Sequence, residues 1–233
     1  MNETDMNDKK RLAAPAEQVW DFPTRAFHWS LVILVAWEWA SSHLGGNWMT
    51  YHMWGGYAVL ALIIFRVIWG FIGSTTARFS SFVRSPQKTW RYLMTLKARR
   101  HHGGPGHNPL GGWAVTAFLL ALAVQAGTGL FATDDILNAG PLNPLVRNRT
   151  ADFLTLVHKT NFDILLGLIA VHVAAIVLHK TLGGKNLLTP MITGHAPVTH
   201  TDVRRAPLVF VQAWRSIMAF GLAAAITWFI VQI

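Results

Sequence analysis

Four histidines lie within or at the edges of long apolar stretches of the chain: His28, His52, His158 and His172. Imidazole nitrogens are good ligands for transition metals, and ionisable side chains within apolar stretches of this length indicate a functional site. The chain contains no cysteine. This excludes disulfides, thiolate zinc sites, Cys-ligated iron–sulfur clusters and covalently attached c-type haem. The histidines are therefore the strongest candidates for metal chemistry.

The stretches that carry these histidines are long enough to cross a membrane. Of the 233 residues, 52% are hydrophobic and 13% are charged, whereas an ordinary soluble domain has about 25% charged residues. A membrane-spanning helix needs about 20 mostly apolar residues. Five segments qualify, namely 27–45, 52–73, 112–131, 158–179 and 208–232. The composition predicts an all-α, multi-pass membrane protein and excludes a long disordered chain.

Basic residues are distributed unevenly between the two sides of these segments. The side that includes the N-terminus holds fifteen Lys and Arg residues, and the other side holds two, Arg147 and Arg149. The fifteen are Lys9, Lys10, Arg11, Arg25, Arg78, Arg84, Lys88, Arg91, Lys97, Arg99, Arg100, Lys180, Lys185, Arg204 and Arg205. Because basic loops remain in the cytoplasm, we expect a cytoplasmic N-terminus and a C-terminus outside. The net charge of +9 then reflects topology and contact with lipid, and we expect no nucleic-acid partner.

This topology places the four histidines in two pairs at matching depths. The fourth segment runs inward, so His158 lies near the outer face and His172 lies deeper. His172 follows His158 by fourteen residues, which at roughly 100° and 1.5 Å per residue puts both on one helix face about 21 Å apart. His52 matches the depth of His158, and His28 matches that of His172. The spacing and the topology thus predict an outer and an inner histidine pair.

Two opposed imidazoles could hold a haem iron from both sides in a four-helix core. Without cysteine the haem would be b-type and held non-covalently. Both axial positions would be filled, which favours electron transfer over oxygen binding. Zinc is less favoured, because two histidines leave its tetrahedral ligand set incomplete. Two haems at different depths would form a relay across the bilayer.

Other polar residues leave alternatives open. His43 could replace His52 as a ligand, and His179, which shares the face of His172, could also serve, although we expect its side chain to reach the interface. Glu38 is either a proton-handling group for quinone chemistry or a polar contact near the outer interface. The remaining histidines are expected to be solvated residues of cytoplasmic loops: His101, His102, His107, His195 and His200.

Three cationic residues are candidates for the haem propionates. Arg66 follows His52 by fourteen residues, so it lies on the same helix face at the cytoplasmic end, where it suits a propionate of the inner haem or anchors the helix. Arg25 and Lys159 could bind other propionates. The pair Gly55–Gly56, which lacks side chains, is expected to let a flat macrocycle approach the backbone.

The segments divide the chain into four parts. We expect a polar cytoplasmic arm at 1–24, a four-helix di-haem domain at 25–182, a polar cytoplasmic linker at 183–207 and an additional transmembrane helix at 208–233.

Several stretches resemble bacterial cytochrome b561 and the cytochrome b subunits of nickel–iron hydrogenases. They are VWDFPTRAFHW at 19–29, HMWGGYAVLALIIFRVIWGFIGSTTARFSSF at 52–82, GHNPLGGW at 106–113, and the two histidines of the fourth segment. The resemblance extends over about residues 19–193. It implies a four-helix core with two b haems in the bacterial inner membrane, the inner one on His28 and His172 and the outer one on His52 and His158.

The resemblance also implies electron transfer between the quinone pool and a redox partner at the outer face, such as a cytochrome or a dehydrogenase. Some members of the family oxidise superoxide and reduce quinone, and Arg147, Arg149 and Lys159 could attract that anion to the outer face. A membrane anchor for a hydrogenase-like complex is a further alternative. A histidine-lined metal transporter would explain neither the depth pairing nor the glycines. The fifth helix departs from the four-helix pattern and leaves the partner and the oligomeric state open.

Overall fold

The computed structural model describes residues 16–97, 106–134, 137–181, 186–197 and 207–233. Some residues of the sequence analysis lie outside these ranges. They are Lys9, Lys10, Arg11, Arg99, Arg100, His101, His102, Lys185, His200, Arg204 and Arg205.

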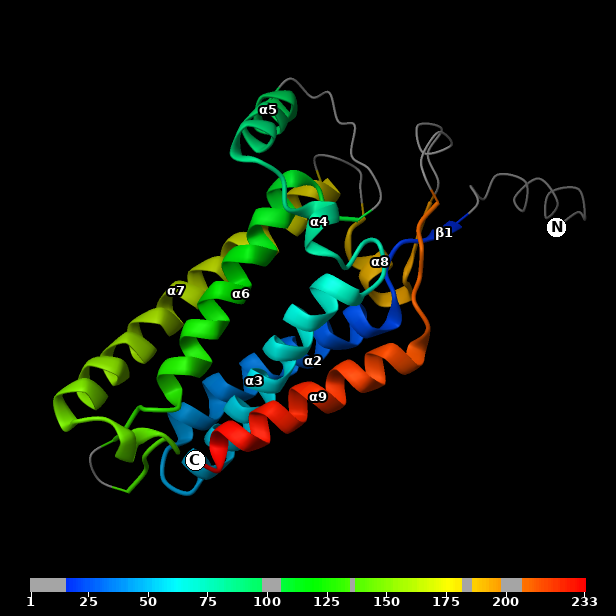
Figure 1. Cartoon of the computed structure of the whole chain (residues 1–233). Coiled ribbons are helices and arrows are strands. Elements are labelled where there is room, and N and C mark those ends of the chain that lie inside the picture. The colour runs from blue at the N-terminus through cyan, green and yellow to red at the C-terminus, as the bar shows by residue number, and fades with distance from the viewer. Residues whose placement is uncertain (1–15, 98–105, 135–136, 182–185, 198–206) are drawn as a thin grey trace, which may run out of the picture.

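The described chain is mostly helical (Figure 1). Its long helices are α2 (Phe22–Leu44), α3 (Trp48–Ile72), α6 (Pro109–Gly129), α7 (Asn148–Thr181) and α9 (Ala213–Val231). The shorter ones are α4 (Phe79–Phe82), α5 (Pro86–Lys97), α8 (Leu188–Thr193) and a 3₁₀ turn at Asn143–Leu145. Strand β1 (Ala16–Gln18) pairs antiparallel with β2 (His195–Pro197). The expected all-α class is confirmed.

Four of the long helices are long and apolar enough to cross a membrane, namely α3, α6, α7 and α9. They agree with four of the five expected spans. Helix α2 has sufficient length at 23 residues but does not belong to this group. Its sequence includes Arg25, His28 and Glu38, which lower its mean hydropathy.

Helix α7 is longer than its apolar segment suggests. It begins at Asn148, ten residues before the expected start at His158, and has 34 residues, a length of about 51 Å. Residues 148–157, which lie between two of the expected spans, are therefore helical. Hydropathy detects the part of a helix that matches the hydrocarbon layer, whereas the hydrogen-bonded backbone continues through polar residues beyond it.

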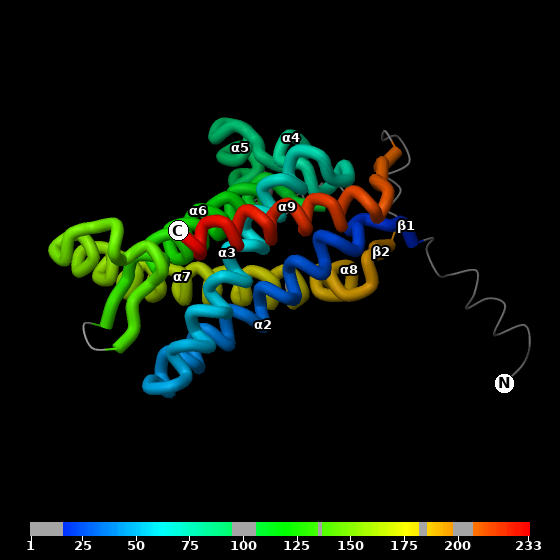
Figure 2. Tube along the Cα trace, turned by 60° about the horizontal axis from the view of Figure 1, so that its bottom comes forward, coloured from blue at the N-terminus to red at the C-terminus, as the bar shows by residue number. Residues whose placement is uncertain are grey.

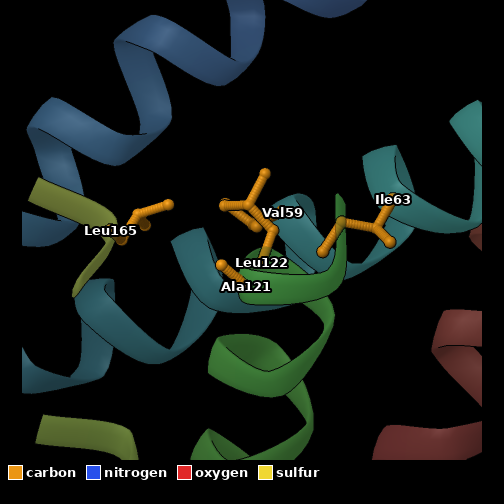
Figure 3. Close-up of a cluster of buried hydrophobic side chains, with 5 residues drawn as sticks. All are labelled: Val59, Ile63, Ala121, Leu122 and Leu165. Atoms are coloured by element: carbon orange, nitrogen blue, oxygen red, sulfur yellow. The ribbon is translucent and has the colours of Figure 1, made fainter. Parts of the chain in front are cut away.

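Helix α3 occupies the centre of the arrangement and contacts α2, α6 and α9, while α7 packs along α6 (Figures 1 and 2). The tight turn between α2 and α3 uses Gly45 and Gly46, whose φ angles of 62° and 56° are costly for other residues. A core cluster joins α3, α6 and α7 through Val59, Ile63, Ala121, Leu122 and Leu165 (Figure 3). Leucines of α2 pack against it, so four helices share this core.

Helix α9 packs on the other side of α3. Its residues Ala219 and Ala223 are buried in a second cluster with Phe65 and Trp69 of α3. The chain before α9 is also tied to the end of α3, because Thr75 N donates to Val209 O at 2.9 Å and Val209 N donates to Thr75 Oγ1 at 2.9 Å. The fifth helix thus belongs to the same body as the other four.

The segment expected as a polar linker has local structure. Helix α8 and strand β2 lie in it, and Gly194 O accepts hydrogen bonds from Val19 N at 2.8 Å and Trp20 N at 3.1 Å. These contacts place the segment after α7 against the start of α2, at the end of the molecule opposite the α2–α3 turn (Figure 1).

Candidate functional site

The outer histidine pair is brought together by α3 and α7. The ring centres of His52 and His158 lie 6.3 Å apart, and the ring planes are inclined by 85°. A metal–imidazole bond of about 2.0 Å, plus about 1.1 Å from the nitrogen to the ring centre, gives about 6.2 Å between two rings on opposite sides of one metal ion. The spacing of the outer pair therefore suits a shared metal.

Backbone carbonyls determine which nitrogen of each outer ring carries hydrogen. His158 Nδ1 donates to Gln125 O at 2.9 Å, and His52 Nδ1 donates to Glu38 O at 3.2 Å. A carbonyl can only accept, so Nδ1 is protonated and the lone pair of a neutral ring lies on Nε2. This is how ligand histidines are commonly oriented in metal sites.

A pair of amide side chains surrounds His158. Asn161 Nδ2 donates to Gln125 Oε1 at 2.7 Å and to Ala121 O at 2.9 Å. The Gln125 amide nitrogen then lies 3.2 Å from His158 Nε2, so it must give way if a metal binds there. Gln125 and Asn161 were not among the site residues predicted from the sequence. Their polar character within apolar helices was the signal that could have found them.

The carboxylate of Glu38 lies against the outer pair. Its Oε2 is 3.1 Å from His52 Nδ1. A Cβ atom added to Gly55 would stand 1.9 Å from Glu38 Oε1. The carboxyl group of α2 thus lies in the space beside Gly55, and the approach of a macrocycle to the Gly55–Gly56 backbone stays a prediction. Of the two roles considered for Glu38, the polar contact is the one seen here.

The inner pair consists of His28 on α2 and His172 on α7, which lie within electrostatic reach of each other. His28 Nδ1 is buried and has no hydrogen-bond partner among the described residues. Its ring contacts Trp29 at 5.0 Å between centres, and the ring of His172, which is exposed on α7, lies 5.6 Å from Phe118. An unpartnered buried nitrogen is costly, so His28 fits a position that receives a ligand.

The two alternative ligands use their ring nitrogens locally. His43 Nδ1 donates to Trp39 O at 2.7 Å, and His179 Nδ1 donates to Ala175 O at 2.8 Å. Each bond spans one turn of the residue's own helix. Within the described ranges, no group of three or more His, Cys, Asp or Glu side chains is placed to hold a metal.

The family model for prokaryotic cytochrome b561 matches residues 19–194. This covers most of the chain and includes all four paired histidines. The chain belongs to the prokaryotic cytochrome b561 family. No curated protein and no solved structure matches it.

Membership of the cytochrome b561 family makes the protein a b-type, electron-transferring cytochrome of the bacterial inner membrane. The match agrees with the resemblance found in the sequence, and its limits differ by one residue from those expected. Helix α9 lies beyond the match, although it packs against the helix that carries His52. The donor set fits haem b, since it offers paired imidazoles and no thiol for covalent attachment.

The structure corrects the expectation that His107 is solvated. Its ring packs 4.6 Å from the Trp20 ring and 4.9 Å from the Phe82 ring, and Nδ1 is buried without a partner. Burial, followed by the nearby charges of Arg66, His172 and His28, lowers the pKa of His107 to about 3. His107 lies just before α6 and contacts Trp20, just before α2, and Phe82, at the end of α4, which a loop assignment from sequence cannot reveal. His195 is exposed, as expected.

The three expected propionate partners occupy different surroundings. Arg66 is buried, with 2% of its surface exposed, and its guanidinium lies 5.2 Å from the Phe79 ring and 5.6 Å from the Phe82 ring. Its Nη1 has no partner among the described residues. Arg25 Nη1 donates to Ile192 O at 2.5 Å, and Lys159 is exposed beside His158. Of the three residues, Arg66 is the buried one, and its unpartnered Nη1 could bind an anionic group.

Proposed function

We propose that this cytochrome b561 binds two b haems, each between two histidines, and relays electrons between membrane quinone and a redox partner at the outer face. His52 and His158 would hold the outer haem, and His28 and His172 the inner one. The observation that carries the proposal is the 6.3 Å spacing of the outer pair with both Nδ1 atoms bound to carbonyls. Haem b, held by these histidines, would supply one-electron chemistry.

The chain's own residues would position and neutralise these groups. Gln125 and Glu38 orient the outer imidazoles through their backbone carbonyls. Arg66, whose unpartnered Nη1 lies in a buried setting, would bind a propionate of the inner haem. Arg25 and Lys159 are the candidates for the other propionates.

We also propose that α2 is the fifth membrane span and that the N-terminus is cytoplasmic. Helix α2 packs along α3 and has 23 residues, which is enough for the hydrocarbon layer. The basic residues then lie mainly in the cytoplasm. Cysteine introduced at Asn47 and at Ser85 tests this, since labelling from outside should reach the first position and not the second.

The haem content of the purified protein tests the main proposal. We expect two haems per chain and a b-type α band in reduced-minus-oxidised spectra. The variants His158→Ala and His28→Ala should each retain one haem, whereas the matched variants His43→Ala and His179→Ala should retain two. A wild-type content well below two, or loss of haem on changing His43 or His179, would overturn the ligand assignment.

A superoxide:quinone oxidoreductase is a second candidate function. The observation that favours it is the exposed Lys159 directly beside His158 at the outer end of α7, where a cation attracts an anionic substrate. Stopped-flow mixing of the oxidised protein with superoxide should then show fast haem reduction that slows in Lys159→Gln. The absence of a fast phase would exclude this second candidate, and electron relay would remain as the proposed function.

A further inference from the structure

One of the four paired histidines contacts a carboxylate. Glu38 Oε2 lies 3.1 Å from His52 Nδ1, and the backbone oxygen of the same residue lies 3.2 Å from it. The two side chains are 13% and 20% exposed, respectively. For His158, His28 and His172 the described residues provide no carboxylate contact. In the outer pair, His158 Nδ1 therefore contacts a neutral carbonyl, whereas His52 Nδ1 contacts both a carbonyl and a carboxylate.

We propose that Glu38 is a positioning residue that sets the electron affinity of the outer haem through His52. This rests on the proposed haem ligation. A carboxylate that accepts the Nδ1 hydrogen draws it from the ring and makes Nε2 a stronger electron donor. In a partly buried setting this effect is weakly screened. The stronger donor favours ferric over ferrous iron, so the outer haem has a lower midpoint potential than it would have without Glu38.

A missing side chain on α3 makes this contact possible. The Cβ atom that any other residue would add at position 55 would stand 1.9 Å from Glu38 Oε1 and 3.0 Å from Trp37 Cδ1. At the neighbouring Gly56 the added Cβ would be 3.8 Å from Glu38 Oε2, which is ordinary contact. Gly55 therefore admits the carboxyl group.

The carboxyl group has little else to bind. Glu38 Oε1 is buried and has no hydrogen-bond partner among the described residues. Ser41, one turn along α2, lies close enough for its hydroxyl to reach His52 Nδ1 at 3.3 Å, but it also donates to Trp37 O at 2.8 Å. The described polar contact of the Glu38 carboxylate is thus His52, which supports a role toward that ring rather than toward packing.

Redox titration at one fixed alkaline pH, at which the Glu38 carboxyl group is ionised, tests the proposal with two independent changes. Glu38→Gln removes the charge and keeps the shape, and Gly55→Ala displaces the carboxyl group without altering its chemistry. Both should favour ferrous iron about tenfold more at one haem, a rise in midpoint potential of about 59 mV for a one-electron couple, and leave the other haem unchanged. Gly221→Ala, on α9 where an added Cβ would meet nothing within 4 Å, should leave both potentials unchanged. The low-spin ferric EPR signal of the same haem should shift in the first two variants.

The outcome separates this inference from the ligand assignment. If the wild type holds two haems and neither Glu38→Gln nor Gly55→Ala changes a potential, the role of Glu38 is refuted while the ligation stands. An equal shift of the midpoint potentials of both haems also refutes it, because such a shift indicates an electrostatic effect that does not act through His52. If Gly55→Ala does not fold, Glu38→Gln alone decides. A wild type without two haems refutes the proposed function itself.

Discussion

The carboxylate of Asp21 joins the start of α2 to the end of α3. Its Oδ2 accepts a hydrogen bond of 3.0 Å from Trp69 Nε1, and its Oδ1 accepts one of 2.9 Å from Thr24 N as the N-cap of α2. Asp21 and Trp69 are both buried, and the carboxylate also attracts the buried Arg66. One side chain therefore serves as a helix cap, an acceptor for a buried indole and a counter-charge.

We expect Asp21→Ala to destabilise the protein strongly. The change removes a helix cap, which costs about 0.5–2 kcal/mol, and leaves a buried donor unpaired, which costs about 1–3 kcal/mol more. Thermal unfolding in detergent should show a lowered melting temperature. Asp152→Ala, at an exposed position of α7, is the control and should change little. Equal melting temperatures for the two variants would contradict this interpretation of Asp21.

Asn161→Leu should loosen His158 indirectly. The change leaves Gln125 Oε1 and Ala121 O without the donor that now binds both, at a cost of about 1–3 kcal/mol. Freed from Asn161, the Gln125 amide no longer has a single orientation beside the ring. We expect lower stability and a broadened ferric signal from the outer haem, with the inner haem unaffected. Thr160→Ala, at the exposed neighbouring position, should reproduce neither effect.

The burial of His107 predicts a pH dependence of stability. Its pKa is about 3 in the folded protein and about 6.5 in an unfolded chain. The unfolded state therefore binds more protons below pH 6.5, so this contribution to stability is fully present above that pH and falls as the pH drops toward 3. His107→Asn should remove the dependence. Melting temperatures of both proteins between pH 7.5 and 5 check this, and parallel slopes would count against it.

Helix α9 should be separable from haem binding. Ala223 is fully buried against α3, so Ala223→Leu overpacks that contact at a cost of about 1–3 kcal/mol. We expect a lower melting temperature with two haems still bound, because the paired histidines lie on α2, α3 and α7. Ala225→Leu, on an exposed face of the same helix, is the control. Loss of haem in Ala223→Leu at a temperature where the protein is folded would show that α9 supports the site.

Much of the arrangement of the paired histidines could be predicted from the sequence. His158 and His172 lie on one helix, so their shared face follows from helical geometry alone. His52 meets His158 because the order of inward and outward helices fixes depth. Which nitrogen carries hydrogen could not be predicted, because it depends on the Gln125 and Glu38 carbonyls of neighbouring helices.

The surroundings of Gly55 and His107 could not be predicted. The residues next to them in the sequence indicate open space at Gly55 and a solvated loop at His107. In the structure Glu38 fills the space beside Gly55, and Trp20 and Phe82 cover His107. These partners lie on other elements, so no local pattern identifies them.

The helical membrane class, four of the spans, the family and the helix faces on which the histidines lie could all be predicted from the amino-acid sequence. These properties depend on hydropathy and helical period, which act over short distances along the chain. Only the packing of the helices shows that Glu38 contacts His52, that Trp20 and Phe82 cover the His107 ring and that α9 covers α3. Such contacts depend on how side chains from distant segments fill the space between helices, which packing decides and local propensity does not.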